Sequence, residues 1–160
     1  RLLITYGTQT GTAASTADFI AQCARRRHID VTVLDLTDVS LVRPLSKLLL
    51  FLRLLGILAQ TSDVVLFVVA TTGQGEPPDN MKVAFAFSYF VFSDMRFVSI
   101  IEIVGPVAPT NLVSNHLATL KFAVFGLGDR SYVKFNAVAR RMYQRLCDLG
   151  AAPVFVLGEG

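Results

Sequence analysis

Apolar and polar positions along the chain predict strands and helices in regular alternation. Five short apolar runs have the length and composition of β-strands: residues 2–6, 31–34, 64–70, 122–125 and 153–157. Residues 13–27 and 136–149 instead repeat apolar side chains at helical spacing, and Gly150 follows at the position where helices commonly end. The run at 64–70 is apolar throughout, which is typical of a strand buried on both faces. The chain is therefore predicted to be an α/β domain with a parallel sheet.

Two further apolar segments fit this alternation badly. Residues 42–60 separate the second strand from the third, and residues 83–109 separate the third strand's loop from the fourth strand. Each is either a buried crossover connection or an insertion foreign to the domain. In the second segment, β-branched and aromatic residues favour extended structure, and Pro106 and Pro109 disfavour a helix. We expect residues 83–109 to be poorly specified and to favour aggregation.

Composition narrows the class of protein. The 160 residues suffice for one domain, and 52% apolar with 17% charged residues excludes a disordered chain. A net charge of +3 without a clustered basic face gives no reason to expect a nucleic-acid partner. Two cysteines and two histidines, far apart, provide neither a disulfide framework nor a metal site, which fits a reducing compartment such as the cytoplasm.

Neither of the most apolar stretches is predicted to cross a membrane. Residues 48–59 are short and include Arg53, and residues 83–107 are interrupted by Asp94, Arg96 and Glu102. A spanning helix needs about 18 uninterrupted apolar residues. We therefore expect no membrane segment in this chain.

The first loop suits a phosphate group. Gly7 to Thr12 reads GTQTGT and opens a helix, whose start offers free backbone N–H groups and three threonine hydroxyls. The loop lacks the lysine of a nucleotide-triphosphate loop, and its glycines, four residues apart, do not match the dinucleotide pattern. It therefore favours a terminal phosphate monoester, with a simple turn capped by threonine as the alternative.

Two later loops suit a flat ring. Residues 70–80 combine two glycines, two threonines and two prolines, so this segment is either a long turn or a backbone-rich contact with a planar ligand. Residues 126–136 include Tyr132, which offers an aromatic face for stacking, and Asn136, which could cap the next helix or bond the ligand. Asp129 has no partner acid or base nearby in sequence, so a role in the turn or at the ring edge is expected. No residue is predicted to be catalytic.

A phosphate loop, a backbone-rich loop and an aromatic loop together resemble the flavodoxin-like domain that binds flavin mononucleotide (FMN). Residues 7–13, 70–82 (ATTGQGEPPDNMK) and 126–136 (GLGDRSYVKFN) are most similar to the amino-terminal domain of the NADPH-dependent diflavin oxidoreductases of cytosolic iron–sulfur assembly. The resemblance covers most of residues 2–160, apart from the two poorly fitting segments. It implies one doubly wound parallel sheet of strand order 2-1-3-4-5, truncated before its last helix.

The resemblance also implies which residues bind FMN. Those of the phosphate loop are Thr8, Gln9, Thr10, Gly11, Thr12 and Ala13. Those bordering the ring are Ala70, Thr71, Thr72 and Gly73. Those holding and covering it are Leu127, Gly128, Asp129, Arg130, Ser131, Tyr132, Val133, Lys134, Phe135 and Asn136, with Tyr132 stacked on one face.

The family relationship further implies an electron-transfer role in a cytoplasmic enzyme. Electrons would pass from NADPH to FAD, both bound in a C-terminal part missing here, then to FMN and to an anamorsin-type iron–sulfur protein. The fragment alone would lack hydride chemistry. Three alternatives remain: a stand-alone flavodoxin-like module, the FMN domain of a methionine synthase or sulfite reductase type of diflavin enzyme, or a non-functional product that does not fold.

Overall fold

The computed structural model describes residues 1–36, 63–78, 81, 117–148 and 150–160. Its elements in chain order are β1 (Leu2–Gly7), α1 (Thr12–Arg25), β2 (Val31–Asp35), β3 (Val64–Ala70), β4 (Lys121–Leu127), α5 (Ala137–Asp148), β5 (Ala152–Pro153) and β6 (Gly158–Glu159). The predicted segments 42–60 and 83–109 lie outside the described residues. The α/β class predicted from the sequence is confirmed.

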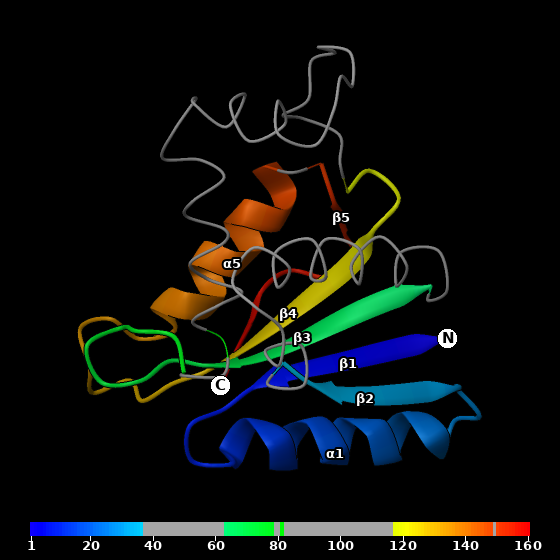
Figure 1. Cartoon of the computed structure of the whole chain (residues 1–160), viewed down its shortest axis with the longest axis horizontal. Coiled ribbons are helices and arrows are strands. Elements are labelled where there is room, and N and C mark those ends of the chain that lie inside the picture. The colour runs from blue at the N-terminus through cyan, green and yellow to red at the C-terminus, as the bar shows by residue number, and fades with distance from the viewer. Residues whose placement is uncertain (37–62, 79–80, 82–116, 149) are drawn as a thin grey trace, which may run out of the picture.

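All strands of the sheet run parallel, in the order β2-β1-β3-β4-β5, with β6 also paired to β4 (Figure 1). Leu2 lies opposite both Val31 and Val64, and Val65 lies opposite Phe122. Because β1 lies between strands that follow it in sequence, the chain reverses its direction of winding at β1 and β3. This is the strand order that the family resemblance implied, and a ligand site is expected outside the carboxyl ends at that reversal.

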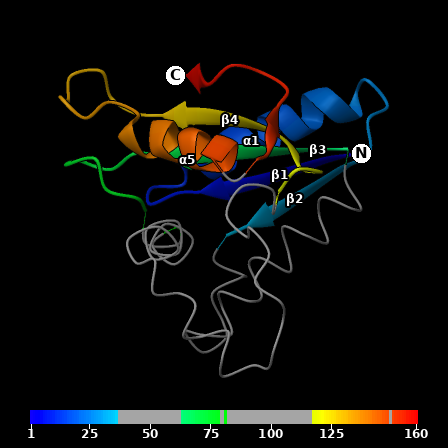
Figure 2. The same cartoon turned by 90° about the horizontal axis from the view of Figure 1, so that it is seen from above.

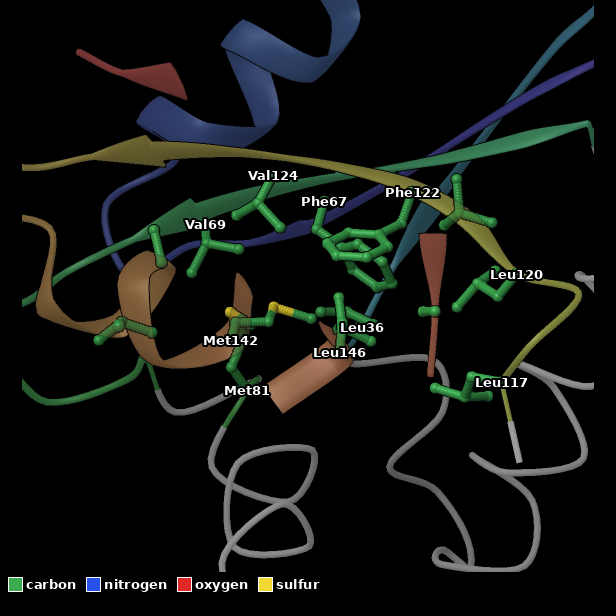
Figure 3. Packing of buried hydrophobic residues seen from close by; sticks show 14 of the residues in the cluster. Leu36, Phe67, Val69, Met81, Leu117, Leu120, Phe122, Val124, Met142 and Leu146 are labelled. Carbon is green, nitrogen blue, oxygen red and sulfur yellow. The ribbon is translucent and has the colours of Figure 1, made fainter. Parts of the chain in front are cut away.

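Among the described residues, α1 covers one face of the sheet and α5 covers the other. On one face, Phe67, Phe122 and Val124 point toward Met142 and Leu146 of α5 (Figure 3). On the other, α1 packs against Ile4 and Val68. The side chains that α1 buries are all alanines: Ala13, Ala17, Ala21 and Ala24. Both faces of β3 are therefore buried, as its uniformly apolar sequence predicted.

The prediction of one continuous last strand at residues 153–157 is wrong. Pro153 pairs with Phe122 and Gly158 with Phe125, so four residues of this segment lie between the two pairs but only two residues of β4 do. The two surplus residues make the segment bulge away from β4 after the Val154 N–H has donated to the Phe122 carbonyl at 2.8 Å, and Val154, Phe155 and Val156 are 48%, 68% and 73% exposed. The apolar run is thus split at the sheet edge instead of forming one continuous strand.

In the part of the chain that the structure describes, neither helix has the length and apolar character needed to cross a bilayer. Among the same residues, no three histidine, cysteine, aspartate or glutamate side chains are grouped to hold a metal ion. The thiols of Cys23 and Cys147 are not joined in a disulfide.

Candidate functional site

The three predicted loops meet at one edge of the sheet. Gly7 at the end of β1 lies opposite Val69, and Val69 lies opposite Gly126, so β1, β3 and β4 end at a common level. The loops that follow them lie at the same end of the molecule in both views (Figures 1 and 2). We refer to residues 8–12 as the first loop, residues 71–78 as the second loop and residues 128–136 as the third loop.

The first loop leads into the start of α1. Gly11 has a φ of 88° and occupies the N-cap position, where the left-handed conformation strongly favours glycine. Its N–H donates to Thr8 Oγ1 at 2.9 Å, and the hydroxyls of Thr10 and Thr12 lie 3.2 Å apart. Gln9, Thr10 and Thr12 are exposed, whereas Ala13 lies on the buried face of α1, against the sheet.

The electrostatics of this helix start favour an anion. No acidic residue lies in the first turn of α1, and no side chain caps the N-cap position. No side chain of the helix's own first turn therefore neutralises the positive end of its dipole, and the exposed hydroxyls of Thr10 and Thr12 are placed beside it. This arrangement can accept a phosphate.

The second loop is a closed turn held from two sides. Both the backbone N–H and the hydroxyl of Thr72 donate to the carbonyl of Glu76, at 3.0 and 2.9 Å. Arg141 of α5 donates to the Gly75 carbonyl at 3.1 Å, and a Cβ at Gly75 would lie only 2.7 Å from the Lys134 side chain. Within the described part of the chain, no atom lies within 4 Å of a Cβ placed at Gly73, so a planar ligand could approach the backbone there.

Thr71 joins the second loop to α5. Its N–H donates to the carbonyl of Leu127 at 2.8 Å, and its hydroxyl accepts from the Val138 N–H at 3.4 Å. The hydroxyl therefore caps the start of α5 from a distant part of the sequence. Of residues 70–73, which are predicted to border a flavin ring, Thr71 thus also has a structural role as the cap of α5.

Replacing Thr71 with valine removes this cap while keeping the shape of the side chain. We expect the free energy of unfolding of the FMN-free protein to fall by about 0.5–2 kcal/mol, the usual effect of losing an N-terminal cap. Urea denaturation measures the change. Thr32→Val on the exposed face of β2 is the matched control, and an equal effect in the two variants would contradict the capping role.

Asn136 does not cap α5 with its side chain. Its carbonyl accepts from the Arg140 N–H at 3.0 Å, but its backbone is left-handed, with a φ of 50°. The side chain is fully buried against Gly126 and Gly128, and within the described ranges its amide atoms have no hydrogen-bond partner. Of its two predicted roles, capping by the side chain is excluded.

The third loop consists of two successive turns. The Asp129 carboxylate accepts from the Ser131 N–H at 2.8 Å, and this hydrogen bond lowers the pKa of Asp129 below its ordinary value of 3.8. The N–H of Tyr132 donates to the Asp129 carbonyl, and that of Phe135 to the Tyr132 carbonyl, both at 3.1 Å. Asp129 thus shapes the turn. Tyr132 remains 53% exposed, so its ring is accessible to a ligand.

The other aromatic residue of the third loop is in a different position. The guanidinium carbon of Arg130 lies 5.7 Å from the centre of the Phe135 ring, and that of Arg140 lies 5.9 Å from it. Both distances fit a cation–π interaction. The Phe135 ring is therefore already in contact with two guanidinium groups, so Tyr132 is better placed to stack on a ligand.

Sequence reasoning missed three charged side chains around these loops: Arg140, Arg141 and Glu159. Arg140 and Arg141 lie in the first turns of α5, so their spacing from Asn136 could have drawn attention to them. Glu159 forms a two-point ion pair with Arg140, at 2.5 and 3.1 Å. Nothing in the sequence indicates this contact, because the bulge before β6 sets where Glu159 lies.

Comparison with known proteins decides the family. A family model described as Flavodoxin matches residues 4–160. The chain belongs to the flavodoxin family. Among solved flavodoxins, oxidised flavodoxin 1 from Bacillus cereus is 20% identical with a TM-score of 0.63, covering 99% of this chain and 82% of that one. The flavodoxin of Streptococcus pneumonia TIGR4 is 21% identical with a TM-score of 0.60, at 99% and 82% coverage.

More similar sequences belong to larger proteins. NADPH-dependent diflavin oxidoreductase 1 of Danio rerio is 38% identical over 157 residues, which are 98% of this flavodoxin domain and 21% of the relative. The Bos taurus protein of that name is 37% identical over 152 residues, covering 95% and 20%. The Arabidopsis thaliana protein is 32% identical over 160 residues, covering 100% and 20%. The chain thus spans about a fifth of the length of these relatives, and the resemblance seen in the sequence is confirmed.

A flavodoxin domain implies FMN binding and electron transfer. The described residues fit that cofactor. A hydroxyl-rich loop at the positive end of α1 suits its phosphate, and the exposed Tyr132 ring and the open space at Gly73 suit its flat ring.

Proposed function

We propose that this chain is the FMN domain of an NADPH-dependent diflavin oxidoreductase of the cytoplasm. In this proposal it accepts electrons from an FAD/NADPH domain and passes them to an anamorsin-type iron–sulfur protein in cytosolic iron–sulfur cluster assembly. The observation that carries the proposal is the difference in similarity. Identity reaches 38% with the diflavin oxidoreductase of Danio rerio but only 20–21% with the two solved flavodoxins.

Bound FMN would supply the one- and two-electron chemistry. The residues of the chain bind and orient it. Amides of the first turn of α1, with the side chains of Thr8, Gln9, Thr10 and Thr12, hold the phosphate, while Gly11 and Ala13 let the backbone approach it. No side chain of the site needs to donate or accept a proton as a catalyst.

The second and third loops hold the ring. Backbone groups at residues 70–73 and 127–128 border its polar edge, and Tyr132 covers one face. Residues 129–131 and 133–136 shape and support the segment that presents Tyr132.

Thr10→Ala tests the phosphate site. Thr10 is exposed beside the start of α1, and its hydroxyl can donate to a phosphate oxygen. We expect FMN affinity to weaken by about 1–2 kcal/mol, the scale of one lost hydrogen bond to a charged group. Isothermal titration measures it, with Thr32→Ala on β2 as the control. A folded protein that binds ATP with magnesium but not FMN would contradict the assignment.

Electron transfer tests the rest of the proposal. The FMN-loaded protein, photoreduced without oxygen, is mixed with an oxidised anamorsin-type protein, and the flavin and iron–sulfur absorbances are followed in time. We expect the flavin band to recover while the cluster bleaches. Bacillus cereus flavodoxin 1 is the control, and equal transfer rates from the two proteins would contradict a specific diflavin role.

A further inference from the structure

The ion pair between Arg140 and Glu159 connects α5 to the last strand. Arg140 Nε and Nη2 lie 2.5 and 3.1 Å from the two oxygens of Glu159, so both oxygens are engaged. The Glu159 side chain is only 30% exposed, compared with 64% for Asp30 in its pair with Arg1. The Arg140 side chain is 56% exposed, so the pair lies at the surface, and its value for positioning comes from the two-point contact of guanidinium with carboxylate, which fixes geometry better than a single contact.

The same arginine connects to the third loop through an aromatic ring. Arg140 and Arg130 both lie within 6 Å of the Phe135 ring centre. The pKa of Glu159 is lowered from its ordinary 4.5, first by the hydrogen bond from Arg140 and also by the charge of Arg130. Glu159, Arg140, Phe135 and Arg130 thus form one contiguous cluster, which we call the brace.

Backbone contacts attach the other end of the third loop to the same segment. The Gly160 N–H donates to the Gly126 carbonyl at 3.0 Å, and the Gly128 N–H donates to the Gly160 carbonyl at 3.3 Å. Gly160, directly after β6, therefore holds the start of the third loop by its backbone, and Glu159 of β6 holds the end of the loop through Arg140 and Phe135. Tyr132 lies between these two attachments.

We propose that Glu159 and Arg140 are positioning residues that hold the third loop, through Phe135, in the conformation that presents Tyr132 to the flavin. The inference rests on the proposed FMN site, and neither residue needs to touch the cofactor. The turns at Asp129 and Tyr132 give the loop its local shape, whereas the brace fixes that shape relative to the sheet.

Glu159→Gln tests the brace because it removes the charge and keeps the size. Asp30→Asn is the matched control, since it removes the carboxylate of another arginine pair, that with Arg1. FMN affinity and the residual fluorescence of bound FMN are measured for both. For Glu159→Gln we expect about tenfold weaker binding and brighter bound flavin, within the usual coupling between contacting groups. The control should match the wild type.

The double variant Arg140→Gln/Glu159→Gln should bind FMN less than about twofold more weakly than Glu159→Gln alone, because the two residues act as one unit. Additive losses would contradict this.

A second measurement needs no FMN. Trypsin cuts after Arg130 and Lys134, both in the third loop, and after Arg26 at the end of α1, which serves as an internal reference. A loop released from the sheet is cut faster because it opens locally more often. We expect Glu159→Gln to raise the third-loop rates about threefold or more relative to the reference, and Asp30→Asn to leave them unchanged.

The outcomes separate this inference from the proposed function. If wild type and Glu159→Gln bind FMN equally, with equal fluorescence and equal cleavage, the brace is wrong and the FMN site stands. If Asp30→Asn weakens FMN binding as much as Glu159→Gln does, the effect is general destabilisation and the brace is also wrong. If the wild type binds no FMN, the proposed function fails, and unchanged cleavage of the third loop would overturn the brace as well.

Discussion

Replacing Phe122 with alanine is expected to lower the free energy of unfolding by about 3–5 kcal/mol, the usual range for a buried phenylalanine. The side chain is fully buried in the core between β4 and α5, and its ring centre lies 5.5 Å from that of Tyr143. Removing the ring leaves a cavity between a strand and a helix that both border the site. Because whole domains are stable by only about 5–15 kcal/mol, much of the native stability would be lost.

Urea denaturation followed by circular dichroism measures this change. Val133→Ala is the control, because Val133 is completely exposed in the third loop and its truncation should change stability by no more than about 0.5 kcal/mol. A loss below about 1 kcal/mol for Phe122→Ala would contradict the packing described for this face of the sheet.

Tyr132→Ala is expected to weaken FMN binding by about 1–3 kcal/mol, by analogy with the stacking of nucleobases on aromatic side chains. The fluorescence of bound flavin should rise, since stacking on tyrosine quenches it. Because Tyr132 is half exposed and outside the core, unfolding of the FMN-free protein should change little. Fluorescence titration measures both the affinity and the quenching.

Tyr132→Phe keeps the ring and is expected to retain both affinity and quenching, which separates stacking from loss of the hydroxyl. Unchanged affinity and fluorescence in Tyr132→Ala would exclude the stacking role. Phe135 would then be the next candidate, although it would first have to leave its two guanidinium neighbours.

Local patterns predicted the parts of the fold that depend on local burial. The strand at Val64–Ala70 was predicted to the residue, because a strand covered on both faces has apolar side chains at every position. The three loops were found for a related reason. Glycines and hydroxyls that directly follow apolar runs must lie at the carboxyl edge of a parallel sheet.

Contacts between distant segments could not be predicted in this way. The prediction of a continuous strand at 153–157 was wrong because composition indicates strand propensity. It does not indicate the register with β4, which forces a bulge. The capping of α5 by Thr71 and the pairing of Arg140 with Glu159 likewise depend on how distant elements pack in three dimensions. The partners of the first contact are 67 residues apart in the sequence and those of the second are 19 apart, far beyond any helical or strand period.

The all-alanine buried face of α1 has a consequence for how a ligand would associate. Methyl side chains have no rotamers to restrict, so the helix lies against the sheet without losing side-chain freedom there, and its first turn is anchored through Ala13. The amides of the first turn of α1 are thus pre-organised, so little of the binding free energy of a phosphate is lost in ordering the chain there. Binding of the flavin ring depends instead on the exposed side chain of Tyr132. We therefore expect association to begin at the phosphate and to finish with closure over the ring.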